Sequence, residues 1–486
     1  MNSVSILIGG EWCAARSGAT FERRNPLDGA VASTAPAAQP ADAVAAVDAA
    51  AQAFGAWSRT GPGERRALLT KAAHALEALA PEFTAAMAAE TGATASWAGF
   101  NVHLAAGMLI EAAALTTQIG GEVIPSDVPG SLAMALREPA GVVLGIAPWN
   151  APVILGVRAI AVPLACGNTV VLKGSELCPA THRLIAQALH EAGLPRGVVN
   201  FISNAPADAA AVVDAMIAHP AVRRVNFTGS THVGKLIAAG CAKHLKPAVL
   251  ELGGKAPFIV LDDADLDAAI AAATFGAFAN SGQICMSTER IVVDVRVADA
   301  FVAGLAARAR ALPLGDPRDT ANGPVVLGSL VDHRAVARCN ALIANALTHG
   351  ATLVCGGQSG NTLFPATLLD HVTPTMRVYH EEAFGPVKGV VRVDGVEAAI
   401  ACANDNSFGL AAAVFGRDIA RALGVARRIE SGICHVNGPT VHDEAQMPFG
   451  GVKGSGYGRF GGRAGIDAFT ELRWITVQTS PRHYPF

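Results

Sequence analysis

From residue 140 onwards, the pattern of hydrophobic and polar positions predicts an alternation of strands and helices. Short and almost continuous apolar runs are typical of strands that are buried on both faces of a parallel sheet. These runs cover residues 141–147, 168–174, 197–202, 222–229 and 248–254. Alanine-rich stretches of helical length separate them, for example 179–192 and 207–218. Together they predict a doubly wound α/β domain.

A second series of the same kind begins near residue 256. It predicts a helix over 265–279 and strands over 256–261, 290–295, 388–393, 411–416 and 432–437. These segments predict a second α/β domain, while the first 120 residues read mostly as alanine-rich helix.

Two further strand-like pieces, 131–139 and 471–480, lie far from both series. We expect them to pair into a small protruding sheet, whose open edge would accept a partner subunit.

Composition excludes several classes of protein. The chain has 486 residues, 51% of them hydrophobic, and a net charge of −3 without runs of like charge. This argues against disorder, nucleic-acid binding and a polybasic membrane surface. The most apolar stretch, 140–172, contains three prolines and is better explained by buried strands than by a membrane span.

The cysteines indicate a reducing compartment. There are nine, an odd number, and no two have C-x-x-C spacing, so neither a disulfide framework nor a zinc site is favoured. We see no signal peptide at the start of the chain and expect a cytoplasmic protein. The histidines show no metal-binding spacing, and we expect no catalytic metal.

Two glycine-containing segments resemble phosphate-binding motifs. The segment 229–235, GSTHVGK, lacks the Ser or Thr that a P-loop needs after its lysine, because Leu236 stands there. It could accept another phosphate at a helix N-terminus, or it could simply be an N-cap formed by Ser230 or Thr231. The segment 456–461, GYGRFG, follows no predicted strand and reads as a tight glycine-rich loop.

Three separated residues are candidates for chemistry. Cys285 ends the small-residue turn NSGQIC, and it could be a buried structural thiol or an exposed nucleophile. Glu251 ends an apolar strand and precedes two glycines, where an unpaired acid would be costly. Asn150 follows a predicted strand at its carboxyl end, where its amide could donate to an oxyanion.

These segments resemble the aldehyde dehydrogenase superfamily in order and approximate spacing. The matching motifs are APWNAP (147–152), VLKGSE (171–176), FTGSTHVGK (227–235), LELGGKAP (250–257), SGQIC (281–285), EEAFGP (381–386) and PFGGVKGSGYGR (448–459). Within the superfamily, the chain is most similar to the salicylaldehyde, benzaldehyde and vanillin dehydrogenases of bacterial aromatic catabolism.

The resemblance implies an α/β fold of three parts. A Rossmann-type NAD-binding domain would comprise 1–120, 142–252 and 441–464, and a catalytic α/β domain would comprise 253–440. A small β oligomerisation flap would comprise 121–141 and 465–486. A homodimer or a dimer of dimers is implied.

The resemblance also assigns roles to the three candidates. Cys285 would add to the aldehyde carbon as a thiolate and give a thiohemiacetal, with the oxyanion held by Asn150 and by the backbone N–H of Cys285. Loss of hydride would leave a thioester, and Glu251 would activate the water that hydrolyses it.

The implied cofactor is NAD. Lys173 and Glu176 match positions that hold the adenine ribose, and Glu176 would repel a 2′-phosphate and so disfavour NADP. The other implied cofactor contacts are Trp149 and Ser230 near the pyrophosphate, Glu382 and Phe384 around the nicotinamide ribose, and also Gly229 and Leu252. Lys255 would help to shape the site.

The implied substrate pocket is lined by Ala151, Leu155, Arg158, Ile284, Met286 and His442. Arg158 is a cation in an apolar helix, and it could form a structural salt bridge or donate to a ring hydroxyl. Trp97 and Phe100 could stack on an aromatic ring or pack in the core.

We therefore expect an aromatic aldehyde as substrate, with salicylaldehyde first, oxidised to its acid. The alternatives are an aliphatic semialdehyde whose carboxylate Arg158 reads, transfer of the acyl group to coenzyme A, and a catalytically silent structural role.

Overall fold

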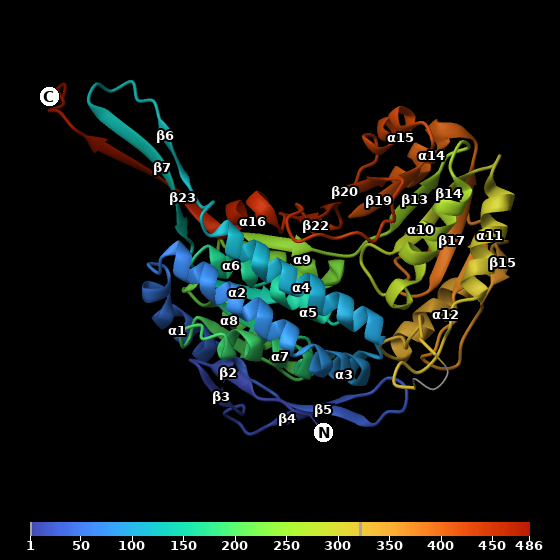
Figure 1. The fold of residues 1–486 in the computed structure, drawn as a ribbon, viewed down its shortest axis with the longest axis horizontal. Coiled ribbons are helices and arrows are strands. Elements are labelled where there is room, and N and C mark those ends of the chain that lie inside the picture. Colours follow the sequence, from blue (N-terminus) through green and yellow to red (C-terminus); the bar gives the residue numbers. More distant parts are fainter. Residues whose placement is uncertain (1, 320–322) are drawn as a thin grey trace.

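The computed structural model describes residues 2–319 and 323–486. Two α/β lobes lie next to each other, and a three-stranded flap projects from the first (Figure 1). Both lobes contain a sheet of mainly parallel strands, so the predicted α/β fold class is confirmed.

The first lobe is built on an eight-stranded sheet with the order β22-β12-β11-β8-β9-β10-β2-β3. Its five central strands are mutually parallel, and they follow the chain order 3-2-1-4-5 from β10 to β12. Such a sheet places ligands at the carboxyl ends of its strands, near the point where the order reverses. The strands are β2 (Ile6–Ile8), β3 (Glu11–Cys13), β8 (Val142–Ile146), β9 (Thr169–Lys173), β10 (Val199–Ile202), β11 (Val222–Thr228), β12 (Ala248–Glu251) and β22 (Gly456–Tyr457).

Helices cover both faces of this sheet because successive strand residues point to opposite sides. Val170 and Leu172 of β9 pack into one core, and Val171 between them packs into the other. The first core holds α2 (Pro62–Ala78), α3 (Ala80–Thr91), α4 (Ala95–Leu115), α5 (Pro152–Arg158), α6 (Ala161–Ala165) and α7 (Pro179–Glu191). The second holds α1 (Pro40–Trp57), α8 (Ala209–Ala218) and α9 (Thr231–Lys243).

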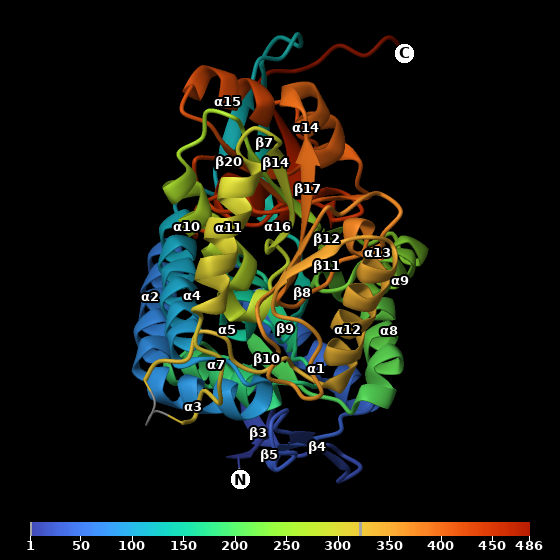
Figure 2. The same cartoon turned by 90° about the vertical axis from the view of Figure 1, so that its right-hand side faces the viewer.

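The second lobe has a seven-stranded sheet with the order β15-β16-β17-β14-β13-β19-β20, parallel except at β15. Figure 2 looks onto this lobe. Its strands are β13 (Ala256–Val260), β14 (Thr288–Asp294), β15 (Thr352–Cys355), β16 (Thr367–Asp370), β17 (Val387–Val393), β19 (Ala411–Phe415) and β20 (Ile433–Val436). Its helices are α10 (Leu266–Phe278), α11 (Ala298–Arg310), α12 (His333–Thr348), α13 (Arg377–His380), α14 (Gly395–Asn404) and α15 (Ile419–Ala426).

A short link carries the chain from one sheet to the other. Strand β12 ends at Glu251, and β13 begins at Ala256 beside Thr288 at the start of β14. The carboxyl ends of the first sheet therefore face the amino ends of the second. The segment before β14, which contains Cys285, meets the end of β12 at this junction.

The flap consists of β6 (Gly121–Ile124), β7 (Ser131–Pro139) and β23 (Thr470–Gln478), with β7 in the centre. The predicted pairing of the two distant strand-like pieces is confirmed, because β23 runs antiparallel to β7 along its whole length. Helix α16 (Gly462–Phe469) leads into it. The domain boundaries given above stay a prediction.

The expectation of a mostly helical N-terminal region is wrong for its first 36 residues. Besides β2 and β3, they form β1 (Asn2–Ser3), β4 (Thr20–Arg24) and β5 (Val31–Pro36), which lie at the base of the first lobe (Figure 2). These strands are short and partly exposed, so they carry little hydrophobic periodicity.

Within the described residues, one helix, α4, is long and apolar enough by composition to cross a membrane. More than half of that stretch, 56%, is buried against the rest of the fold. Its contacts with α2, α3 and α5 make it a core helix of the first lobe.

Candidate active site

A strained turn holds Cys285 at the junction of the lobes. Asn280, Ser281 and Gly282 all have left-handed backbone angles, with φ of 48°, 54° and 73°. Such angles are costly for residues other than glycine and persist only where the surroundings enforce them. Here the side-chain NH₂ of Gln283 donates to the carbonyl of Ser329 at 3.2 Å, and Oε1 of Gln283 accepts from the backbone N–H of Val331. Cys285 is consequently half-buried rather than walled off.

The carboxylate of Glu251 faces this thiol. Cys285 Sγ lies 3.8 Å from Glu251 Oε2, and Glu251 Oε1 is buried without a protein partner. Burial raises the pKa of Glu251 to about 8. Burial and the charge of Glu251 both raise the pKa of Cys285. The approach requires Gly254, because a Cβ there would stand 2.2 Å from the carbonyl oxygen of Cys285.

The amide of Asn150 completes this group. Asn150 Nδ2 donates one hydrogen bond, of 3.0 Å, to the carbonyl of Gln283. An amide nitrogen has two hydrogens, which leaves one for a ligand. The carbonyl of Asn150 accepts from Trp97 Nε1 at 2.9 Å, so Trp97 helps to fix this loop. The structure thus brings together the three residues that were predicted for catalysis.

Cys285 and Asn150 line one cavity of about 260 Å³. It is lined by all eight residues predicted for the substrate pocket, including Ala151. Trp97 and Phe100 stack on each other with their ring centroids 5.4 Å apart, and both also line the cavity. Phe275 and Phe449 add two more aromatic rings, so the walls are mainly apolar and aromatic.

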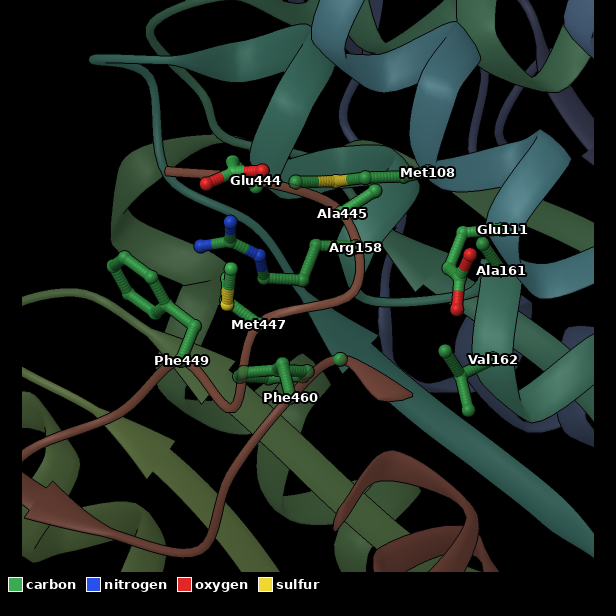
Figure 3. A pocket seen from close by; sticks show the side chains of 11 residues that line it. Met108, Glu111, Arg158, Ala161, Val162, Glu444, Ala445, Met447, Phe449 and Phe460 are labelled. Carbon is green, nitrogen blue, oxygen red and sulfur yellow. The ribbon is translucent and has the colours of Figure 1, made fainter. Parts of the chain in front are cut away.

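Arg158 forms the salt bridge that was one of its two predicted roles. Its guanidinium pairs with Asp443, and both side chains are almost fully buried. It also lies over the ring of Phe449, 4.1 Å from the centroid. Figure 3 shows Arg158 between Phe449, Met447 and Glu444, which line a small neighbouring cavity. His442 is half-exposed and contacts Glu444.

The predicted cofactor residues follow the carboxyl ends of the first sheet. Lys173 ends β9 and pairs with Glu176, which also accepts from Asn204 at 3.0 Å. Ser230 follows β11 and caps α9, accepting from the N–H of Val233 at 3.3 Å. The N-cap interpretation of this segment is therefore confirmed, and an N-terminus of this kind also favours anions.

Comparison with known proteins decides the family. The model of the aldehyde dehydrogenase family matches residues 12–475. The chain belongs to the aldehyde dehydrogenase family. It is 65% identical to a vanillin dehydrogenase of Pseudomonas fluorescens and 50% identical to a salicylaldehyde dehydrogenase of Pseudomonas putida, with at least 99% of this chain covered in each case and 100% and 99% of the relatives.

Solved structures agree with this assignment. The crystal structure of a salicylaldehyde dehydrogenase from Pseudomonas putida G7 in complex with salicylaldehyde has a TM-score of 0.98 to this fold. It is 50% identical in sequence and is covered completely, as is this chain. Enzymes of this family use a nicotinamide cofactor.

In this aldehyde dehydrogenase, two further residues predicted to contact the cofactor, Glu382 and Phe384, lie on the loop 381–386. A buried cluster of charged side chains fixes the position of this loop. Glu382 accepts from the N–H of Gly254 at 2.8 Å, and Phe384 packs edge-on against Trp149. The sequence analysis did not identify Glu289, which binds the backbone of this loop. Glu289 accepts from the N–H groups of residues 383 and 384, at 3.0 and 3.1 Å.

Glu289 lies between two buried lysines. Lys255 is 2.8 Å from it and Lys388 is 3.5 Å away. These two cations keep the pKa of Glu289 below its ordinary value, against the effect of burial. The signal in the sequence was a glutamate within the apolar strand TERIVVD. Asp443, by contrast, has no such signal in the sequence, because it lies in a segment without hydrophobic periodicity.

Proposed function

We propose that this aldehyde dehydrogenase oxidises aromatic aldehydes to carboxylic acids with NAD. The observation that carries the proposal is a single cavity with Cys285 and Asn150 at one place and aromatic rings along its walls. Flat rings are held well by such walls. The names of the relatives, vanillin and salicylaldehyde dehydrogenases, point to the same class of substrate.

Catalysis begins at the thiol. Because burial keeps the proton on Cys285, the thiol needs a base, and the carboxylate of Glu251 at 3.8 Å accepts that proton. The sulfur then bonds to the aldehyde carbon, and the carbonyl oxygen becomes an oxyanion. The free hydrogen of the Asn150 amide and the backbone N–H of Cys285 donate to it.

Collapse of this thiohemiacetal expels hydride from the carbon and leaves a thioester on Cys285. A nicotinamide held by Glu382 and Phe384 would supply the acceptor for that hydride. The unpartnered Oε1 of Glu251 provides a place for a water molecule beside the thioester. Glu251 first releases the thiol proton to solvent and then takes a proton from the water as the water oxygen attacks the carbon. The carbon–sulfur bond breaks, the departing sulfur receives that proton from Glu251, and the acid leaves.

The residues present fit an adenine nucleotide with a free ribose. Lys173 and Glu176 offer a cation and a carboxylate to its hydroxyls, and Ser230 lies at the start of α9 where a pyrophosphate would be favoured. Glu382 and Phe384 would hold the nicotinamide ribose. The carboxylate of Glu176 would repel a 2′-phosphate, which supports NAD over NADP.

The salt bridge of Arg158 weakens the semialdehyde alternative. A cation that binds the distant carboxylate of a substrate would need an unpaired charge, whereas Arg158 is already paired with Asp443.

The nine cysteines are free thiols, which supports a reducing, cytoplasmic location.

A substrate panel tests the proposal. The purified protein is assayed for reduced cofactor with benzaldehyde, salicylaldehyde, vanillin, a medium-chain aliphatic aldehyde and succinate semialdehyde, with NAD and NADP in parallel. We expect kcat/KM for the best aromatic aldehyde to exceed both aliphatic values at least tenfold, with loss of the signal in Cys285→Ala. A tenfold preference for either aliphatic aldehyde would overturn it.

A further inference from the structure

Asp443 lines the substrate cavity and has a buried carboxylate oxygen without a hydrogen-bond partner among the described residues. Its Oδ2 receives the guanidinium of Arg158, while its Oδ1 is buried and has no hydrogen-bond partner among the described residues. Only 6% of the side chain is exposed. Asp443 and Arg158 both line the cavity that contains Cys285.

A buried carboxylate oxygen without a donor is unfavourable, so a native site that retains one needs an explanation. Burial accordingly raises the pKa of Asp443. A second such oxygen, Oε1 of Glu251, belongs to the carboxylate beside Cys285. The proposed reaction gives Glu251 a water molecule as its donor, but it leaves Asp443 without one.

The surroundings of Asp443 define the donor that fits. The positive charge of Arg158 is compensated by the ion pair, and its guanidinium is also held against the ring of Phe449. The pair as a whole is neutral, so it does not attract an anion. What it offers to the cavity is an acceptor beside aromatic walls, and the group that matches is a hydroxyl on an aromatic ring.

We propose that Oδ1 of Asp443 accepts a hydrogen bond from a ring hydroxyl of the aromatic aldehyde, and that this contact selects hydroxylated benzaldehydes. The inference rests on the proposed function and deepens it. Sites that are built to bind a substrate hydroxyl reject analogues without one, because their buried polar group is then left unpaired.

The wild-type enzyme provides the first test, because an acceptor such as Asp443 and a donor such as Arg158 favour different ring substituents. If Asp443 reads the ring, a hydroxyl is favoured and a methoxy group, which cannot donate, is not. If Arg158 reads the ring, both groups serve as acceptors. The ortho, meta and para isomers of hydroxybenzaldehyde are compared with the matching methoxybenzaldehydes and with benzaldehyde. We expect the best hydroxyl isomer to exceed its methoxy counterpart and benzaldehyde at least tenfold in kcat/KM.

The variant Asp443→Asn provides the second test. Arg158 will hold the amide oxygen, which leaves the NH₂ group in the place of Oδ1. That group donates, so the ratio of kcat/KM for the hydroxyl isomer to kcat/KM for its methoxy counterpart should fall at least tenfold.

Asp370→Asn is the matched control. Asp370 has the same side-chain exposure, 6%, and pairs with Arg392 at 2.8 Å in the second lobe, away from the cavity. This variant breaks a comparable ion pair and should leave the substituent preference unchanged.

The outcomes separate the two proposals. If the wild type oxidises no aromatic aldehyde, the proposed function fails and this inference with it. If it oxidises them with equal kcat/KM for hydroxyl and methoxy isomers, only the inference fails. It also fails if Asp443→Asn lowers all substrates equally. Should Asp443→Asn not fold, as judged by thermal unfolding, the wild-type series decides alone.

Discussion

The sulfur of Cys285 lies 3.8 Å from the carboxylate of Glu251, although 34 residues and a change of sheet separate the two in the chain. One acid beside one thiol could serve as base twice, first for the thiol and then for the attacking water. Both tasks require Glu251 to be ionised, and its burial opposes ionisation.

The first prediction concerns the pH dependence of turnover. Because burial raises the pKa of Glu251 to about 8, the carboxylate forms only as the pH rises through that value. We expect kcat to increase between pH 6 and pH 9 and then to level off. Glu251→Gln should lower kcat by about 10²–10⁴-fold and abolish the increase. Steady-state rates in a constant-ionic-strength buffer series measure both effects.

A retained increase in Glu251→Gln would contradict this assignment. It would point to another group, of which Glu382 is the first to examine, because burial raises its pKa to about 7.

The second prediction concerns the oxyanion. Asn150→Ala removes the amide donor but keeps the backbone carbonyl that Trp97 contacts. We expect kcat to fall by about 10²–10³-fold, as is typical for the loss of one such donor. Asn340→Ala, which removes a remote amide bonded to residue 359, should have no effect on kcat.

The reactivity of Cys285 toward iodoacetamide shows whether the turn survives the change at Asn150. If alkylation is unchanged and kcat also stays within threefold of the wild type, Asn150 does not hold the oxyanion.

The central strands could be predicted from the sequence because both faces of them are buried. The run 141–147, for example, contains β8 (Val142–Ile146), in which all five residues are buried. The N-terminal strands could not be predicted, because pairing rather than hydrophobicity defines them. In β4 (Thr20–Arg24), exposed and half-buried residues alternate, and three of the five are charged.

Those residues of the site that lie in recognisable sequence motifs could be predicted. Cys285, Glu251 and Asn150 each end a recognisable segment, but only the fold shows that they meet. Asp443 was not predictable, because its partner Arg158 is 285 residues away and no local pattern connects them. Glu289 had a visible signal, a charge in an apolar strand, whose meaning depends on two lysines from other strands or loops.

The third prediction concerns the choice between NAD and NADP. Glu176→Gln removes the charge that would repel a 2′-phosphate but keeps an oxygen for Lys173 and Asn204. We expect kcat/KM for NADP to rise about tenfold or more, while that for NAD falls. The ratio of the two values, measured with one aldehyde, is the readout, and Glu430→Gln on the surface is the control. An unchanged ratio would remove Glu176 as the determinant.

The fourth prediction assigns a positioning role to Glu289. Glu289→Gln keeps one acceptor oxygen, so one of the two N–H groups of the 381–386 loop loses its partner, and Lys255 and Lys388 lose their counter-charge. Because that loop carries Glu382 and Phe384, KM for the cofactor should rise about tenfold, while KM for the aldehyde changes less than threefold. A role in stability alone would lower the temperature of unfolding without separating the two KM values, and that result would contradict the prediction.

The last prediction concerns assembly through the flap. Strands β6 and β23 form its two edges, and large apolar side chains are exposed on them, with Trp474 77%, Val123 71% and Leu472 63% accessible. Exposed edges and apolar patches favour association. We propose a homodimer or a dimer of dimers that depends on this flap. The double variant Leu472→Asp, Trp474→Glu should therefore move the mass measured by light scattering toward the 49.5 kDa of one chain.

The control for this variant is Ile419→Asp, which places a charge on an exposed apolar position of α15, 57% accessible, in the other lobe. It should leave the mass unchanged. Because the cavity and the catalytic residues lie within one chain, the flap variant should retain measurable oxidation of the aldehyde, with its mass as the property that changes. A wild type that already runs as a single chain, or a flap variant of unchanged mass, would show that the exposed edges of β6 and β23 do not hold subunits together.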